Sequence, residues 1–177
     1  AHPDTDFHIR YGNTQKLLSL LCDGLIDFAI VEGYFKGDNY QTRIFQSEEY
    51  IAVASKDHVF QNPVTSLRDL TSERLLLREH GAILTKTLAL KNMSIYDFPH
   101  IIEVENIHTI VSLLCEDCGI SFLYKAAVEK EIQQGTLKQI PLSDFMVMHD
   151  FPFFWNKDSS FSEEYEGIFQ ELLRLSK

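Results

Sequence analysis

Basic residues are scarce in this chain. Lys and Arg together number 16, against 26 Asp and Glu, so the net charge at pH 7 is −10. Direct binding of DNA or RNA needs clustered Lys and Arg side chains that contact the phosphates. The charge balance therefore argues against a nucleic-acid interface on this chain.

Long apolar runs and cysteines are scarce as well. No stretch approaches the roughly 18 consecutive apolar residues of a membrane-spanning helix, and no basic segment followed by an apolar one opens the chain. The three cysteines leave one over in any disulfide pairing, which is typical of a reducing compartment. We expect a cytoplasmic protein that does not contact a membrane.

Two of the cysteines, Cys115 and Cys118, have the C-x-x-C spacing of redox motifs. In those motifs the N-terminus of a helix lowers the pKa of the thiol, whereas these cysteines end a helical pattern and flank two carboxylates. That setting disfavours the thiolate. We therefore predict that the thiols are buried and structural.

The sequence also lacks the spacings that metal sites and common catalytic centres need. Its seven histidines form no H-x-H, H-E-x-x-H or H-x-x-x-H pattern. Glu103, Glu105 and His108 lie close together in the chain but have no matching fourth ligand. No G-x-S-x-G, P-loop or G-x-G-x-x-G motif is present. We predict no metal, no cofactor and no enzymatic activity.

The most regular pattern lies in the second half of the chain. Ile101 to Val104 alternates as a strand does, and apolar residues then recur at helical spacing from Ile107 to Cys118. Asn106 can cap this helix, and Gly119 can end it in the left-handed conformation. The apolar run from Ile120 to Tyr124 predicts a parallel strand that is buried on both faces.

The pattern continues through a second helix and another strand. The helix is predicted from Ala126 to Gln134 and is closed by Gly135, and Leu137, Ile140 and Leu142 then return as a strand. Strands and helices that alternate with short links predict a right-handed α/β unit with a parallel sheet.

The first part of the chain predicts a strand, a helix and a strand. Phe7 to Tyr11 alternates as a strand. Asn13 or Thr14 can cap a helix that Gly24 ends, and Leu25 to Val31 reads as a buried strand. The remaining predicted strands are 41–45, 50–54, 74–77 and 151–155, and the remaining helices are 66–70, one from the 79–81 turn to about residue 92, and one from residue 162.

Several segments together resemble one known family. The segment ENIHTIVSLLCEDCGISFLYKAAVEKEIQQGTLKQIPL, residues 105–142, looks like the end of the effector-binding domain of LysR-type transcriptional regulators. CDGLIDFAIVEG, EEYIAVASKDHVF and SLRDLTSERLLLREHGAILTKTL resemble the same family in the same order, so the resemblance covers nearly the whole chain. One departure is that Asp117 and Cys118 precede Gly119, where the family usually has a small residue and a glycine.

This resemblance implies a fold and a domain organisation. The expected fold is α/β and two-lobed, of the periplasmic-binding-protein-like type 2, with two crossover strands. Lobe 1 would hold residues 1–54 and 151–177, and lobe 2 residues 55–150. The family normally has one more strand and helix in lobe 1, preceded by a DNA-binding helix-turn-helix. We therefore expect both to be missing from this chain.

An effector site is expected in the cleft between the lobes, because ligands bind open α/β sheets at the carboxyl ends of their strands. Backbone N–H groups in the turns at Gly81 and Asn106 favour a small anion. The negative charge of Glu32 argues against an anionic ligand and favours one with an amino group. The alternative is that Glu32 is only a solvated surface carboxylate. The candidate effector-binding residues are Asn13, Thr14, Glu32, His80, Gly81, Ile83, Thr85, Asn106, Ile107, His108 and Tyr124.

The expected function is that of a ligand-sensing regulatory domain. In the resembling family, a small and usually anionic metabolite controls DNA binding, and the domains pair. We expect a homodimer or tetramer that contacts DNA only through the missing N-terminal module. The alternative is the solute-binding protein of a transporter, which has the same two-lobed architecture. An enzyme is the weakest alternative, because no catalytic constellation is present.

Overall fold

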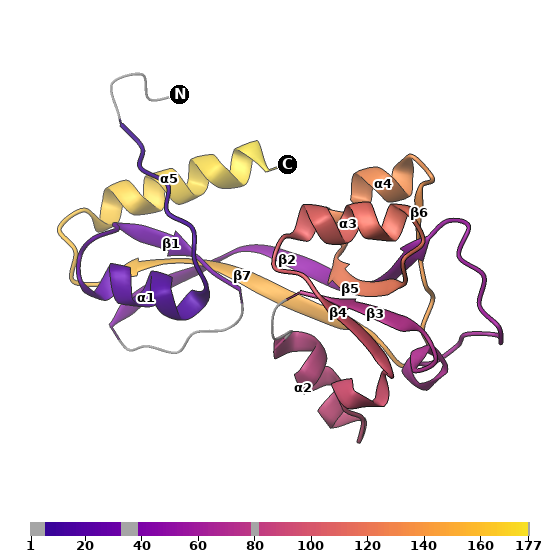
Figure 1. Ribbon diagram of the computed structural model, residues 1–177. Coiled ribbons are helices and arrows are strands. Elements are labelled where there is room, and N and C mark those ends of the chain that lie inside the picture. Colours follow the sequence, from indigo (N-terminus) through magenta and orange to yellow (C-terminus); the bar gives the residue numbers. More distant parts are fainter. Residues whose placement is uncertain (1–5, 33–38, 79–81, 177) are drawn as a thin grey trace. The chain divides into compact units, whose positions relative to one another are not determined.

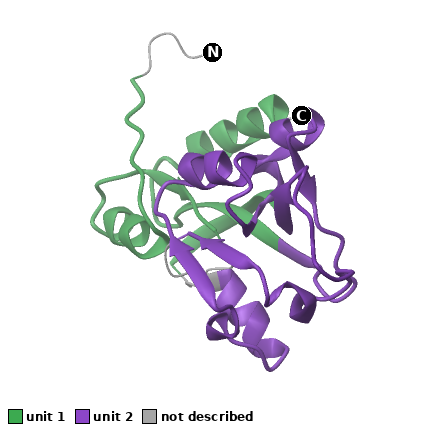
Figure 2. Cartoon of the chain, turned by 45° about the vertical axis from the view of Figure 1, so that its right-hand side comes forward, with its two compact units in different colours: residues 1–47, 149–177 green, residues 48–148 purple. Residues whose placement is uncertain are grey.

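The computed structural model describes residues 6–32, 39–78 and 82–176. The chain divides into two units: unit 1 holds residues 1–47 and 149–177, and unit 2 holds residues 48–148 (Figure 2). Strand β2 (Tyr40–Ser55) runs from unit 1 into unit 2, and strand β7 (Val147–Asn156) runs back. The strands pair in the order β1-β7-β2-β5-β3-β4, and β6 also pairs with β2.

Unit 2 is built on three parallel strands, β3 (Arg74–Leu77), β4 (His100–Glu103) and β5 (Ile120–Tyr124). Strand β2 runs antiparallel to β5 on one side and to β6 (Leu137–Gln139) on the other. The helical elements are α2 (Ala82–Leu90), α3 (Ile107–Cys115) and α4 (Glu129–Gln133), with short 3-10 turns at Leu67–Leu70, Ile95–Asp97 and Lys125–Ala127.

Alternate residues of these strands enter two separate cores, because successive side chains of a strand point to opposite faces. Helix α2 covers one face and α3 and α4 cover the other (Figure 1). Each leucine buried in this way contributes about 1.5–3 kcal/mol. On the first face Leu75 and Leu77 pack with Leu84 and Leu88, and on the second Leu76 packs with Ile110 and Leu114.

Unit 1 is organised in the same way around β1 (Phe28–Ile30), which pairs antiparallel with β7. Helices α1 (Thr14–Cys22) and α5 (Ser162–Leu175) cover its two faces (Figure 1). On one face Leu21, Ala29, Val31 and Phe154 pack together, and on the other Phe153, Trp155, Tyr165 and Phe169 do so.

The strand predicted at Phe7 to Tyr11 is wrong. These residues form no regular element, and Phe7, Ile9 and Tyr11 are 57%, 72% and 85% exposed. An alternating pattern becomes a strand only where a partner takes up its N–H and C=O groups. No strand among the described residues pairs with this segment.

The two strands predicted at 41–45 and 50–54 are one continuous strand, β2. The polar residues between them interrupt the apolar alternation, yet this stretch contains neither glycine nor proline. The polar side chains find partners instead. Ser47 donates its hydroxyl to Asp150 of β7 at 2.5 Å, so polarity is compatible with an unbroken strand here.

The last part of the predicted parallel unit is also different. The helix predicted from Ala126 to Gln134 is a 3-10 turn followed by α4, and Gly135 ends it with φ +71°, as predicted. Strand β6 is shorter than the predicted one and pairs antiparallel with β2 rather than in a parallel sheet.

The end of α3 differs from its prediction at one residue. Asp117, not Gly119, takes the left-handed position, with φ +55°. The N–H groups of Asp117 and Cys118 donate to the carbonyls of Leu114 and Leu113, both at 3.0 Å, which closes the helix in a Schellman motif. The strain of a non-glycine residue there is offset by the Asp117 carboxylate, which contacts Nδ1 of His58 at 2.5 Å.

The prediction of buried thiols is wrong. Cys22 and Cys115 are exposed, and Cys118 is partly exposed. In α3 the core positions are taken by Ile110 and Leu114, and the neighbouring Cys115 is left facing solvent.

Gly119 is required for a different reason. Its φ is +148°, and a Cβ on it would lie 2.4 Å from the carbonyl oxygen of Arg74. The strand-to-strand contact between β5 and β3 therefore begins where only glycine fits.

Replacing Gly119 with Ala should destabilise the chain far more than replacing Gly135 with Ala. Gly135 also has a positive φ, +71°, but a Cβ there meets nothing within 4 Å. We expect roughly 1 kcal/mol for Gly135→Ala and roughly 2–4 kcal/mol for Gly119→Ala, measured by urea unfolding. Equal losses would contradict the steric argument.

The turn before β3 depends on one carboxylate. Asp69 accepts the backbone N–H groups of Thr65 and Ser66 at 2.9 and 2.8 Å, and both of their hydroxyls. These bonds, first those from the two backbone N–H groups, hold the pKa of Asp69 below its ordinary value of 3.8.

The stability that Asp69 provides should therefore depend on pH. Because its folded-state pKa is lowered, this stability is present above the ordinary value of 3.8 and is lost as pH falls through the folded pKa. Asp69→Asn should be less stable than the unchanged chain near neutral pH, and the difference should shrink below about pH 4. Thermal unfolding across this range measures both, and a difference independent of pH would contradict the role of the charge.

Candidate functional site

The parallel strands bring three chain segments to one edge of unit 2. Leu77 of β3 lies opposite Glu103 of β4, and the N–H of Val104 donates to the carbonyl of Leu77 at 2.9 Å. β5 runs parallel to β3, so its last residue, Tyr124, lies toward the same edge. Helices α2 and α3 begin just after β3 and β4, so their N-termini also lie at what we call the carboxyl edge (Figure 1).

The start of α3 is fixed by Asn106. As predicted, its side chain caps the helix: Oδ1 accepts the N–H groups of His108 at 2.8 Å and Thr109 at 3.4 Å. Asn106 and His108 are exposed, and Ile107 is half-buried against the core. The first turn therefore presents polar groups and the positive end of the helix dipole at the carboxyl edge.

The start of α2 contributes a second set of groups. Ile83 is half-buried against the α2-facing core, and Thr85 is exposed. Thr87 differs, because its hydroxyl donates to the carbonyl of Ile83 within the helix at 2.9 Å. His80 and Gly81, the other candidates from this turn, lie outside the described residues.

Tyr124 ends β5 and is half-buried. Its ring packs edge-on against Tyr50 of β2, with the ring centroids 5.2 Å apart. The next residue, Lys125, places its ammonium 3.4 Å from a carboxylate oxygen of Glu49. This exposed ion pair contributes little to stability but places a charge of each sign beside Tyr124.

The sequence did not single out Tyr50, Glu49 or Lys125. Tyr50 becomes a neighbour of Tyr124 only through the antiparallel register of β2 and β5, in which the two residues lie opposite each other. Lys125 could have been predicted from the sequence as a site residue, because it directly follows the end of a predicted strand.

The other described candidates belong to unit 1. Asn13 caps α1 by accepting the N–H of Lys16 at 2.9 Å, and Thr14 is the first, half-buried residue of that helix. Glu32 follows β1 and is exposed, with its carboxylate 4.0 Å from Nδ1 of His149. The structure thus brings Ile83, Thr85, Asn106, Ile107, His108 and Tyr124 to one edge of unit 2 and describes Asn13, Thr14 and Glu32 within unit 1.

The chemistry of the carboxyl edge is that of recognition by hydrogen bonds. It offers backbone N–H groups, an amide, a hydroxyl, an imidazole and a phenol. The described residues contain no group of three or more His, Cys, Asp or Glu that could hold a metal ion. Within residues 6–32, 39–78 and 82–176, no helix is long and apolar enough to cross a membrane.

Comparison with known proteins identifies the family to which the chain belongs. The family model described as the LysR substrate binding domain matches residues 1–176. The chain belongs to this family. The fold is accordingly the type 2 periplasmic-binding-protein-like fold of LysR substrate binding domains, as predicted.

One similar protein is the probable RuBisCO transcriptional regulator of Thalassiosira pseudonana, which is 23% identical over 182 residues. The alignment covers 97% of this LysR substrate binding domain and 59% of that regulator. Other curated relatives are covered over 48% to 60% of their length, so the chain spans about half to three fifths of the regulators it matches.

Two solved structures show the same fold. The regulatory domain of HypT from Salmonella typhimurium, in its apo form, has a TM-score of 0.79 at 14% identity, covering 98% of this chain and 85% of that one. The regulatory domain of CcmR from Synechocystis PCC6803, in complex with 2-PG, has a TM-score of 0.76 at 15% identity, covering 93% and 80%.

The Asn106 cap makes a measurable contribution to stability. Asn106→Ala removes the acceptor for two first-turn N–H groups and should cost about 1 kcal/mol, whereas Asn106→Asp keeps an acceptor and should cost less. Urea unfolding measures both. Equal stability of the Ala and Asp variants would show that the side chain does not act as a cap.

Proposed function

We propose that this LysR substrate binding domain senses a small polar metabolite and thereby controls transcription. The observation that carries the proposal is the carboxyl edge of unit 2, where two helix N-termini and the end of β5 come together. Open α/β sheets bind ligands at this kind of edge.

The residues proposed to contact the effector are those at the carboxyl edge. The first turn of α3 presents the positive end of its helix dipole, which favours a carboxylate or another small anion. The Thr85 hydroxyl, the His108 imidazole and the Tyr124 phenol would fix its orientation, and the half-buried Ile83 and Ile107 would contact its apolar part. Asn13, Thr14, Glu32, His80 and Gly81 remain predicted contacts.

Control would arise from differential affinity. An effector that binds one conformation of the domain more tightly than another shifts the population toward it, by no more than the difference in binding free energy. Lys125 and Glu49 beside Tyr124 are well placed to respond, because an anion near Tyr124 would compete with Glu49 for the ammonium.

The wider activity belongs to the longer regulators that this chain matches. We propose a cytoplasmic regulator that acts as a homodimer or tetramer and contacts DNA through a module outside this chain. The relative from Thalassiosira pseudonana is named a transcriptional regulator, and the CcmR domain is described in complex with 2-PG. This family favours regulation over catalysis and over the solute-binding protein of a transporter.

A thermal-shift screen of the chain against small carboxylates, amino acids and inorganic oxyanions tests the proposal. A ligand at 100 times its Kd should add about 2.7 kcal/mol and raise the Tm by a few degrees. Thr85→Ala should then weaken binding roughly tenfold, because one hydrogen bond is lost. Thr87→Ala is the matched control and should leave binding unchanged, because its hydroxyl is bonded within the helix. Equal affinities of the two variants would place the site elsewhere.

A further inference from the structure

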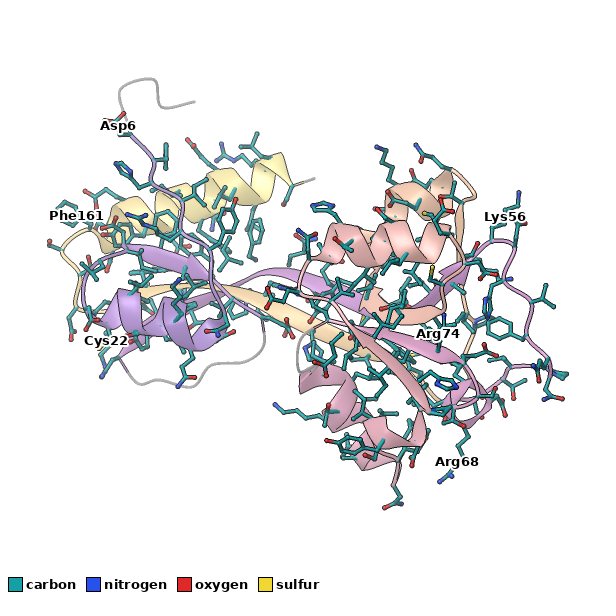
Figure 3. All side chains as sticks on the ribbon, viewed as in Figure 1. Asp6, Cys22, Lys56, Arg68, Arg74 and Phe161 are labelled. Atoms are coloured by element: carbon teal, nitrogen blue, oxygen red, sulfur yellow. The ribbon has the colours of Figure 1, made fainter. Side chains whose placement is uncertain are left out.

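Unit 2 also holds a pocket of about 550 Å³, lined by residues 58–64 and 138–141. The first segment follows β2, whose Ala54 lies opposite Ile120, the first residue of β5. Lys56 lies near the beginning of this segment (Figure 3). The pocket therefore lies toward the amino end of the parallel strand β5, away from Tyr124 and the carboxyl edge.

Several bonds hold the walls of this pocket. The N–H of Lys56 donates to the carbonyl of Thr136 at 2.9 Å, which ties the first segment to the chain before β6. The Lys138 ammonium donates to the carbonyls of Lys56 and His58 at 3.1 and 2.7 Å. The His58 ring is only 11% exposed and contacts Asp117. These bonds hold the two lining segments together.

The charge of the lining is opposite to that of the chain. The pocket is lined by one lysine and one histidine, and by no Asp or Glu, whereas the whole chain has a net charge of −10. Two carboxylates, Asp117 and Glu73, contact the two nitrogens of the His58 ring, at 2.5 and 3.3 Å. They are thus directed at His58 rather than at Lys138.

Lys138 keeps a donor for a ligand. An ammonium carries three N–H groups, and the described carbonyls take two of them. Its nitrogen lies 5.6 Å from the centre of the Phe60 ring, so the charge is next to an apolar surface. Of the other lining residues, Val59, Val64, Ile140, Pro63 and Pro141 are apolar, and Gln61, Asn62 and Gln139 carry amides.

We propose that this pocket is a second ligand site and binds a small monocarboxylate with an apolar body. The carboxylate would accept the third N–H of Lys138, and the apolar body would lie against Phe60, Val64 and Ile140. A volume of 550 Å³ falls within the usual range of small-molecule sites. Recognition at the carboxyl edge is a separate event.

The first experiment compares three probes of the same length, hexanoate, 1-hexanol and hexylamine, by calorimetric titration of the chain. Hexanoate should bind at millimolar concentration or below, and the other two at least roughly tenfold more weakly, because only the carboxylate pairs with Lys138. Absence of hexanoate binding at millimolar concentration, or equal affinity for hexanol, would overturn the proposal.

The second experiment locates the binding. Val59 lines the pocket and is 83% exposed, so it tolerates polar substitution. Val59→Glu should weaken hexanoate binding roughly fivefold through like-charge repulsion, and the isosteric Val59→Gln should leave it within about twofold. Equal affinities of these two variants would overturn the proposal.

Two further variants distinguish binding in this pocket from binding at the carboxyl edge. Lys138→Met should weaken hexanoate binding at least roughly tenfold. If loss of the Lys138 hydrogen bonds unfolds the segment, the Val59→Glu and Val59→Gln variants still test the location of the site. Asn106→Asp adds a negative charge at the carboxyl edge, so it should weaken hexanoate binding only if hexanoate binds at that edge. A loss of affinity in Asn106→Asp that equals the loss in Lys138→Met would show that hexanoate binds at the carboxyl edge, and would overturn the proposal.

Discussion

Burial of the strands on both faces is the constraint on which the rest of unit 2 depends. A strand covered on both sides cannot alternate apolar with polar residues, so Leu75, Leu76 and Leu77 follow one another and enter two different cores. Each core then requires its own helix. This requirement fixes α2 and α3 on opposite faces, and it also makes β3, β4 and β5 parallel, because a helix connects successive strands.

The location of the carboxyl edge follows from this arrangement. When parallel strands are joined by helices on both faces, the helix N-termini of both layers open at the same end of the sheet. Asn106 therefore serves the fold and the proposed site together: its side chain satisfies the first turn of α3 and holds that turn where a ligand would meet it. Toward the opposite end of the sheet, the pocket is lined by chain segments that Lys138 holds together by hydrogen bonds.

The sequence predicted local structure correctly where interactions within one short segment determine it. The Asn106 cap, the β5 strand and the glycine at 135 were predicted because short-range hydrogen bonding and local burial decide them. The sequence did not predict structure that depends on contacts with residues far away in the chain. Phe7 to Tyr11 alternates, but none of the described strands pairs with it. Strand β2 continues through polar residues, and Ser47 there donates a hydrogen bond to Asp150 of β7. In the site, Tyr50 joins Tyr124 only through strand register, which local patterns do not encode.

The path of the chain through the two units has a consequence for its synthesis. Unit 2 is continuous in sequence, whereas unit 1 combines residues from both ends of the chain. Phe28 pairs with Trp155, so the β1–β7 ladder cannot form until the residues of β7 have left the ribosome. Unit 2 can bury its cores earlier, because domains complete in sequence fold as they emerge. The aromatic residues of β7 and α5 are made only after unit 2 is complete, so the apolar side chains of β1 stay uncovered until then.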